Sequence, residues 1–160
     1  MHSLIRKFDF VLGSGNAARA YVTVNNGELH ELPLRWFSRR TGWALSPGYE
    51  RNNVRFDRTL TSRCMSCHNA YPEQIPFVSG KFINVPEGIS CERCHRAGAL
   101  HVEERLAEFT PRDSIDLTII NQTHLSISRQ IDVCQQSHTT GAATVLKEGR
   151  GDFDFRPGQT

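Results

Sequence analysis

The chain has 160 residues, with 19 basic and 17 acidic side chains and a formal net charge of +2. The absence of a dense Lys/Arg surface argues against a dedicated nucleic-acid binder, and no apolar run approaches the ~20 residues of a membrane-spanning helix. The hydrophobic fraction is 38%, below the usual share of about 45–50%. We therefore expect one domain-sized module. Its apolar side chains are too few to form a stable core alone, so we expect a further component to complete the core.

The first 50 residues predict a small β-hairpin followed by an aromatic loop. Two short runs, 21–24 and 28–32, flank an Asn-Asn-Gly sequence, and an Asn-Gly turn between such runs is a strong hairpin signal. We expect Pro33 to end the second strand. Four large aromatic residues follow in a loop-rich stretch: Trp36, Phe37, Trp43 and Tyr49.

From residue 57 onward the pattern becomes helical. Asp57 is the expected N-cap of a helix that runs into residues 64–68, and a second short helix is expected near 90–95. Apolar residues at helical spacing predict further helices over 101–109 and 123–138.

The last 20 residues form a polar, Gly-rich tail anchored by Phe153, Phe155 and Pro157. The sequence thus predicts a mainly α fold with a small N-terminal β-hairpin and much irregular loop. Residues 1–50, 57–140 and 141–160 are expected to be subregions of a single module, which is interpreted as a fragment of a longer protein.

One five-residue motif occurs twice, as CMSCH at 64–68 and as CERCH at 91–95. Both copies are C-x-x-C-H, the pattern of a c-type haem attachment site. Two thiols one helical turn apart can add to the two vinyl groups of a porphyrin, and the imidazole that follows can bind the iron. We therefore predict two haem c groups, bound through four thioethers and two proximal iron ligands: Cys64, Cys67 and His68 for the first, and Cys91, Cys94 and His95 for the second.

The four cysteines also allow a zinc-ribbon-like structural or interaction module. Their 23-residue gap is slightly longer than the usual gap of about 15–20 residues. The histidine that follows each pair favours haem, because random placement of 7 His in 160 residues would produce both matches in only about 0.2% of cases. A thioredoxin-like site would need a βαβ context, which the pattern lacks.

A degenerate third copy, CQQSH, lies at residues 134–138. The hydroxyl of Ser137 cannot form a stable thioether, so attachment at two points is lost. Cys134 and His138 keep their places in a degenerate third site. We therefore predict two covalent haems rather than three.

Three other histidines are candidate distal iron ligands. His101 lies six residues after His95, and six extended residues reach at most ~20 Å. Because Gly98 favours a turn between them, His101 is more simply assigned to the haem at His68. His124 at a helix start and His30 in the hairpin can both project outward.

Several segments resemble bacterial multihaem c-type cytochromes, particularly those whose haem module precedes tetratricopeptide repeats. The resembling segments cover most of the chain in order: LGSGNAARAYV (12–22), ELPLRWF (31–37), WALSPGYE (43–50), CMSCHNAYP (64–72), EGISCERCHRAGALHVE (87–103), DVCQQSH (132–138) and DFDFRPG (152–158). Two departures concern a third haem. Ala17 stands where the family tends to have His, and Ser137 where it has Cys.

The resemblance implies a multihaem cytochrome c module organised around covalent haems, with His101 as an axial ligand. It further implies electron transfer between unidentified redox partner proteins, a periplasmic or otherwise extracytoplasmic location, and a downstream tetratricopeptide-repeat region. The chain shows no signal-peptide pattern of its own. If both irons carry two histidines, a relay is favoured over an enzyme. A multihaem oxidoreductase with an open haem site is the alternative.

Overall fold

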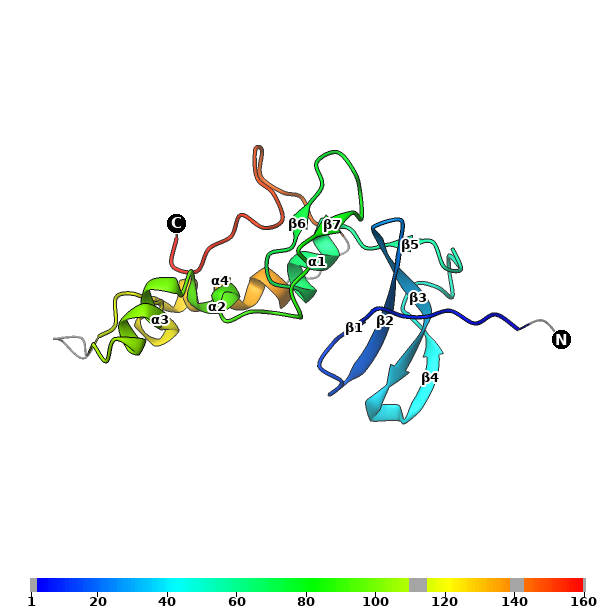
Figure 1. Ribbon diagram of the computed structural model, residues 1–160, viewed down its shortest axis with the longest axis horizontal. Helices are drawn as coiled ribbons and strands as arrows, with labels where there is room; N and C mark the ends of the chain where they lie inside the picture. Colours follow the sequence, from blue (N-terminus) through cyan, green and yellow to red (C-terminus); the bar gives the residue numbers. More distant parts are fainter. Residues whose placement is uncertain (1–2, 110–114, 139–142, 160) are drawn as a thin grey trace. The chain divides into compact units, whose positions relative to one another are not determined.

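The computed structural model describes residues 3–109, 115–138 and 143–159 (Figure 1). The chain divides into two compact units: the first spans 1–68 and 72–85, and the second spans 69–71 and 86–160. The expectation that these residues act as one module, with the subregion bounds given above, stays a prediction.

The first unit is built on a five-stranded antiparallel sheet. Its strands are β1 (Phe10–Leu12), β2 (Ala18–Asn25), β3 (Glu28–Phe37), β4 (Gly42–Leu45) and β5 (Arg58–Thr59). The order is β1-β2-β3-β4, and β5 also pairs with β3 (Figure 1). The short 3₁₀ helix η1 (Ser38–Arg40) joins β3 to β4.

The predicted hairpin is confirmed as β2 and β3, which pair from Asn25↔Glu28 onward. Its turn uses the left-handed backbone, with φ of 51° at Asn26 and 81° at Gly27. Pro33, however, does not end the second strand. The register shifts between the pairs Ala20↔Arg35 and Val22↔Glu31. Pro33 lies on β3 within this irregular stretch, where a residue without an N–H is tolerated.

A buried polar cluster joins β3 to the loop that follows the sheet. Glu31 is buried, and its carboxylate accepts hydrogen bonds from Arg35 at 3.0 Å and Arg58 at 3.1 Å. The hydroxyl of buried Tyr49 donates to the carbonyl of Glu31 at 2.8 Å. The guanidinium of Arg58 also lies 3.7 Å from the centre of the Tyr49 ring, so these residues hold β3, β5 and the 46–50 loop together.

Helix α1 (Ser62–His68) follows β5 in the same unit. The expectation that Asp57 caps this helix is wrong, because residues 58 and 59 pair with β3 as a strand. The backbone bond from Met65 N to Thr61 O closes the first turn instead. A separate two-stranded sheet, β6 (Glu73–Gln74) and β7 (Phe82–Ile83), completes the unit.

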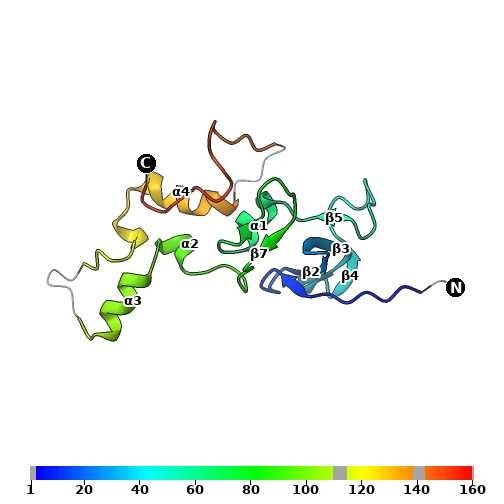
Figure 2. The same cartoon turned by 45° about the horizontal axis from the view of Figure 1, so that its top comes forward.

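The described residues of the second unit form three α-helices: α2 (Glu92–His95), α3 (Ala99–Leu106) and α4 (Ile127–His138) (Figure 2). The predicted helices over 101–109 and 123–138 are confirmed with shifted bounds. Before α4, the side chain of Asn121 accepts from Thr123 N and caps a 3₁₀ turn, η2 (Gln122–His124). The long helix itself begins after this turn, at Ile127.

The tail is anchored as expected at Pro157, which is fully buried. Arg129 of α4 donates to the carbonyl of Gly158 at 2.6 Å, which holds the tail against that helix. Phe153 and Phe155 are half-buried. Of the predicted tail, residues 141, 142 and 160 lie outside the described residues.

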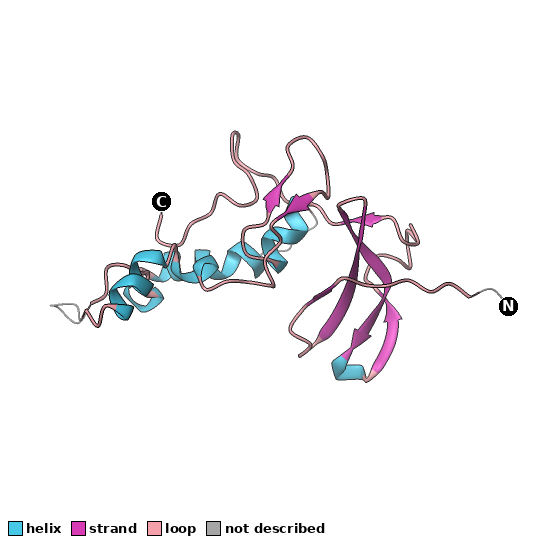
Figure 3. Cartoon of the chain, viewed as in Figure 1, coloured by secondary structure: helices cyan, strands magenta, loops and turns pink. Residues whose placement is uncertain are grey.

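The predicted mainly α fold is wrong. In the described residues helices and strands occupy similar shares (Figure 3). The stretch interpreted as an aromatic loop forms the β3–β4 hairpin, in which Trp36 and Trp43 pair across the strands with ring centres 5.5 Å apart. Among the described residues, no helix combines the length and apolar character needed to cross a membrane.

Candidate functional site

The first motif lies on α1, whose faces differ in burial. Met65 and Ser66 are each 1% exposed, while Cys64 and Cys67 are half-buried and His68 is exposed at the helix end. Residues three and four apart share one side of a helix, so the two thiols and the imidazole lie on the face away from Met65 and Ser66. The buried pair anchors the helix and leaves the motif accessible.

The environment of His68 favours its neutral form. Although His68 as a whole is exposed, nearby protein atoms partly desolvate its ring and lower its pKa from the ordinary value. The positive charge of Arg35 lowers the pKa further, and Glu31 opposes both effects. Because the neutral imidazole is the form that binds a metal ion, this environment favours the metal-binding form of His68.

The second motif lies on the short helix α2, which is anchored by a buried cation. Arg93 is 3% exposed, and its guanidinium lies 5.0 Å from the centre of the Tyr71 ring and 6.0 Å from that of Phe153. Cys91 is exposed and Cys94 half-buried. As on α1, the middle of the motif faces inward and the thiols remain accessible.

The ring of His95 is fixed by the backbone of Ile120. Its Nδ1 lies 2.8 Å from the carbonyl oxygen of Ile120, while the amide of Ile120 donates to the His95 carbonyl at 3.0 Å. A carbonyl can only accept, so Nδ1 carries the proton and the neutral ring has its lone pair on Nε2. This is the usual arrangement of a metal-binding histidine, whose other nitrogen donates to a carbonyl or carboxylate.

His101 on α3 has a comparable partner. Its Nδ1 lies 2.8 Å from Oδ2 of Asp116, and both side chains are about a quarter exposed, at 30% and 22%. Two hydrogen bonds from Thr118 to the Asp116 carboxylate, from its hydroxyl and its amide, are the main causes that lower the pKa of Asp116 to about 2. The carboxylate is therefore ionised at neutral pH and accepts a hydrogen bond from Nδ1–H of His101.

The degenerate third motif lies at the end of α4. Cys134 and His138 are exposed, and buried Val133 anchors the helix. Gln136, inside the motif, donates through its side-chain amide to the carbonyl of Arg93 at 2.8 Å. The helix that carries Cys134 therefore packs against the second motif by a direct hydrogen bond.

The two other candidate ligands, His30 and His124, differ in burial. His30 lies on β3 and is 7% exposed, with Nε2 3.6 Å from a carboxylate oxygen of Glu28. It does not project outward as expected. His124 ends η2 and is exposed. Among the described residues, no hydrogen bond or ion pair joins either histidine to an intact motif, and their roles as iron ligands stay predictions.

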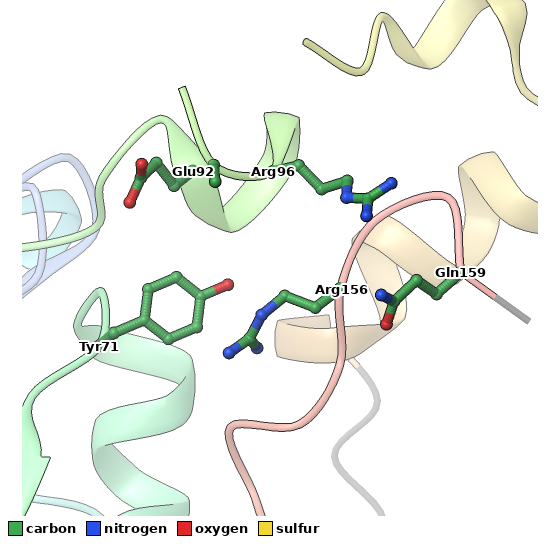
Figure 4. A pocket seen from close by; sticks show the side chains of 6 residues that line it. Tyr71, Glu92, Arg96, Arg156 and Gln159 are labelled. Atoms are coloured by element: carbon green, nitrogen blue, oxygen red, sulfur yellow. The ribbon is translucent and has the colours of Figure 1, made fainter. Parts of the chain in front are cut away.

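A cavity of about 350 Å³ lies beside the second motif. Its lining combines charged and polar groups with apolar surface, and consists of Tyr71, Glu92, Arg96, Ala97, Arg156 and Gln159. The guanidinium of Arg156 lies 4.5 Å from the centre of the Tyr71 ring, whose hydroxyl is directed between α2 and the tail (Figure 4). Two guanidinium groups and a hydroxyl are donors that suit carboxylates.

The donor set fits covalent haem at both intact motifs. No disulfide joins any of the five cysteines, so the thiols can react. Each helix presents two thiols and an adjacent imidazole on an accessible face. Within the described ranges no group of three or more His, Cys, Asp or Glu residues gathers around a metal-sized site. This pattern of two thiols followed by an imidazole is typical of c-type haem attachment.

Comparison with known families supports this class. Residues 46–96 match the family model described as cytochrome c554 and c-prime. The matched segment is about a third of the chain and includes both intact motifs from first cysteine to histidine. The match supports a c-type cytochrome, a class that binds haem through such cysteine pairs.

Among solved structures, the chain is similar to the outer cell wall cytochrome OcwA, with 17% identity and a TM-score of 0.47. That similarity covers 78% of this chain and 23% of the other. The chain thus spans less than a quarter of the length of that protein. No curated protein sequence matches the chain.

Four residues near the motifs were not singled out from the sequence. Tyr71 and Arg156 lie within two segments that resemble multihaem cytochromes, so the resemblance could have marked them as candidate site residues. Asp116 and Ile120 lie in no recognisable motif. Their importance comes from their closeness to His101 and His95 in space, which local sequence does not reveal.

Proposed function

We propose that the chain is an electron-transfer multihaem c-type cytochrome with two covalent haem c groups. The observation that carries the proposal is that one cytochrome family match spans both C-x-x-C-H motifs. The accessible thiols of α1 and α2 support it, as does the fixed tautomer of His95. Haem iron supplies one-electron redox chemistry, which the protein tunes through its ligands and surroundings.

Each side chain has a defined role in this proposal. Cys64 and Cys67 hold one haem and Cys91 and Cys94 the other, while His68 and His95 are the proximal ligands. Residues of the cavity beside α2 supply positive charge for haem carboxylates through Arg96 and Arg156. The third motif, with Cys134 and His138, carries no covalent haem, because Ser137 removes one of the two links.

His101 is the proposed distal ligand with the strongest support. Its Nδ1 is bound to Asp116, which leaves Nε2 as the electron-pair donor. Its assignment to the haem at His68 comes from the sequence and remains part of the proposal. Bis-histidine irons have no open position for a substrate, so a relay is favoured over an oxidoreductase.

The cellular setting follows from the chemistry of attachment in this class of protein. We propose a periplasmic or otherwise extracytoplasmic location, with redox proteins as partners and a downstream tetratricopeptide-repeat region in a longer chain. The family match supports the location, and the partners and the repeat region rest on the sequence resemblance.

A spectroelectrochemical titration of the chain, produced with a haem-ligation pathway, tests the proposal. We expect uptake of two electrons per chain and low-spin spectra in both redox states, as two irons with two histidines each would give. A high-spin oxidised spectrum would instead identify an open haem site and favour the oxidoreductase. One zinc ion per chain and no haem would overturn the proposal. His68→Ala should change the spectrum of one haem, and an unchanged spectrum would contradict the role of His68.

A further inference from the structure

One short segment of the second unit serves two histidines. Residues 116–120 supply the acceptor for Nδ1 of His101, the Asp116 carboxylate at 2.8 Å, and the acceptor for Nδ1 of His95, the Ile120 carbonyl at 2.8 Å. The two acceptors are four residues apart and differ in charge. The segment therefore orients both imidazoles, but it gives His101 a charged acceptor and His95 a neutral one.

The Asp116 carboxylate is itself held in place. Both the amide and the hydroxyl of Thr118 donate to its Oδ1, and Nη2 of Arg105 lies 3.4 Å from its Oδ2. One carboxylate oxygen is thus occupied by Thr118, and the other faces His101. An acceptor fixed in this way restricts the rotation of the His101 ring.

The charge of the acceptor has a chemical consequence. A histidine whose N–H donates to a carboxylate becomes a more basic metal ligand. A more basic ligand stabilises ferric iron over ferrous iron, which lowers the reduction potential. His95, which donates to a neutral carbonyl, lacks this effect.

We propose that Asp116 is a positioning residue that directs Nε2 of His101 to a haem iron and lowers the reduction potential of that haem. The inference rests on the proposed function, because it requires His101 to bind iron. It adds a specific residue to that function and predicts that the two haems of the chain differ in potential. Thr118 supports Asp116 and contributes indirectly.

Redox titration of the haem-loaded Asp116→Asn variant tests this inference. Asparagine keeps a similar shape and removes the charge, so one of the two reduction waves should move upward by about 59 mV, a tenfold change in the equilibrium constant for a one-electron step. The other wave should stay in place. Asp116→Glu should restore part of the lower potential. Asp132→Asn removes one exposed carboxylate of α4 in the same unit and should move neither wave.

The outcomes separate this inference from the proposed function. The covalent haem count, measured by intact mass on the same samples, tests the function. Two haems with neither wave shifted in Asp116→Asn, or with both waves shifted equally, would overturn the role of Asp116. If Asp116→Asn does not fold, Thr118→Val provides the second test, because it loosens the carboxylate without removing its charge. A small upward shift of one wave supports the inference, and unchanged waves overturn it.

Discussion

The two units carry the same motif on very different supports. Of the nine buried hydrophobic residues among those described, seven lie in the first unit, and only Ala70 and Val133 lie in the second. In the second unit, buried Arg93 lies near the rings of Tyr71 and Phe153. Hydrogen bonds from the side chains of Gln136 and Arg129 to backbone carbonyls take the place of apolar packing. A helix with the same five-residue pattern can thus belong to a unit with an apolar core in one place and to a unit held by polar contacts in another.

This difference has an energetic meaning. Burial of apolar surface is the main stabilising contribution in a folded domain. The side chains of the second unit bury little apolar surface, and the haem that it is proposed to bind would add more. We therefore expect haem to complete the core of the second unit, whereas the sheet of the first unit is stabilised by its own side chains.

The largest expected effect comes from removing one pair of thiols at a time. Cys91→Ala with Cys94→Ala should remove one haem and leave the second unit open to proteolysis and rapid hydrogen exchange. Cys64→Ala with Cys67→Ala should also remove one haem but leave the sheet of the first unit protected. Hydrogen exchange followed by mass spectrometry compares the two units in each variant. Equal loss of protection in both units would show that the comparison is wrong.

The next effect concerns the degenerate motif on α4. Ser137→Cys restores the second thiol, one turn from exposed Cys134, and should raise the covalent haem count by one. Intact mass provides the measurement, and Ser128→Cys on the same helix serves as a control that adds a thiol outside the motif. A count that stays at two in Ser137→Cys would contradict our interpretation of residues 134–138.

The polar cluster of the first unit should contribute a moderate amount of stability. Glu31→Ala leaves Arg35 and Arg58 without their shared carboxylate. Because both arginines are about a quarter exposed, at 27% and 26%, the loss should be about 2–3 kcal/mol, slightly below the value for a fully buried pair. Chemical denaturation measures it. Glu50→Ala, at an exposed position, should change the free energy of unfolding by less than about 0.5 kcal/mol.

The smallest expected effect is that of Tyr49. Tyr49→Phe removes the hydrogen bond to the Glu31 carbonyl and should cost about 1 kcal/mol. Burial raises the pKa of Tyr49 above its ordinary value of 10.0, so the folded protein retains the phenol proton more tightly than the unfolded chain. This stabilisation is complete below pH 10 and is lost as the pH rises through the folded-state pKa.

Unfolding measured from pH 9 to pH 11 tests that dependence. The wild-type protein should lose more stability over this range than Tyr49→Phe. Parallel curves for the two proteins would show that Tyr49 is not buried as described.

Local patterns predicted much of the second unit and of both motif helices. The spacing of cysteines and apolar residues is a local property, so α1, α2, α3 and α4 could be placed to within a few residues. The Asn-Gly turn likewise located the β2–β3 hairpin, because its backbone geometry depends on two adjacent residues.

The remaining sheet could not be predicted in this way. β5 has two residues and exists because His30 pairs with Thr59 and Glu31 with Arg58, partners nearly thirty positions apart. Asp57 has the chemistry of a helix cap but precedes this strand instead. At the candidate site, Asp116 and Ile120 gain their significance only when folding brings them to His101 and His95. In each of these examples, the structure depends on contacts between residues that are far apart in the sequence.

The intact mass of the unmodified chain, produced with a haem-ligation pathway, tests the central claim most directly. The two C-x-x-C-H helices predict a mass equal to the polypeptide plus two haems, and the same mass should persist after denaturation, because thioether bonds are covalent. A mass without haem, or with three haems, would contradict the account.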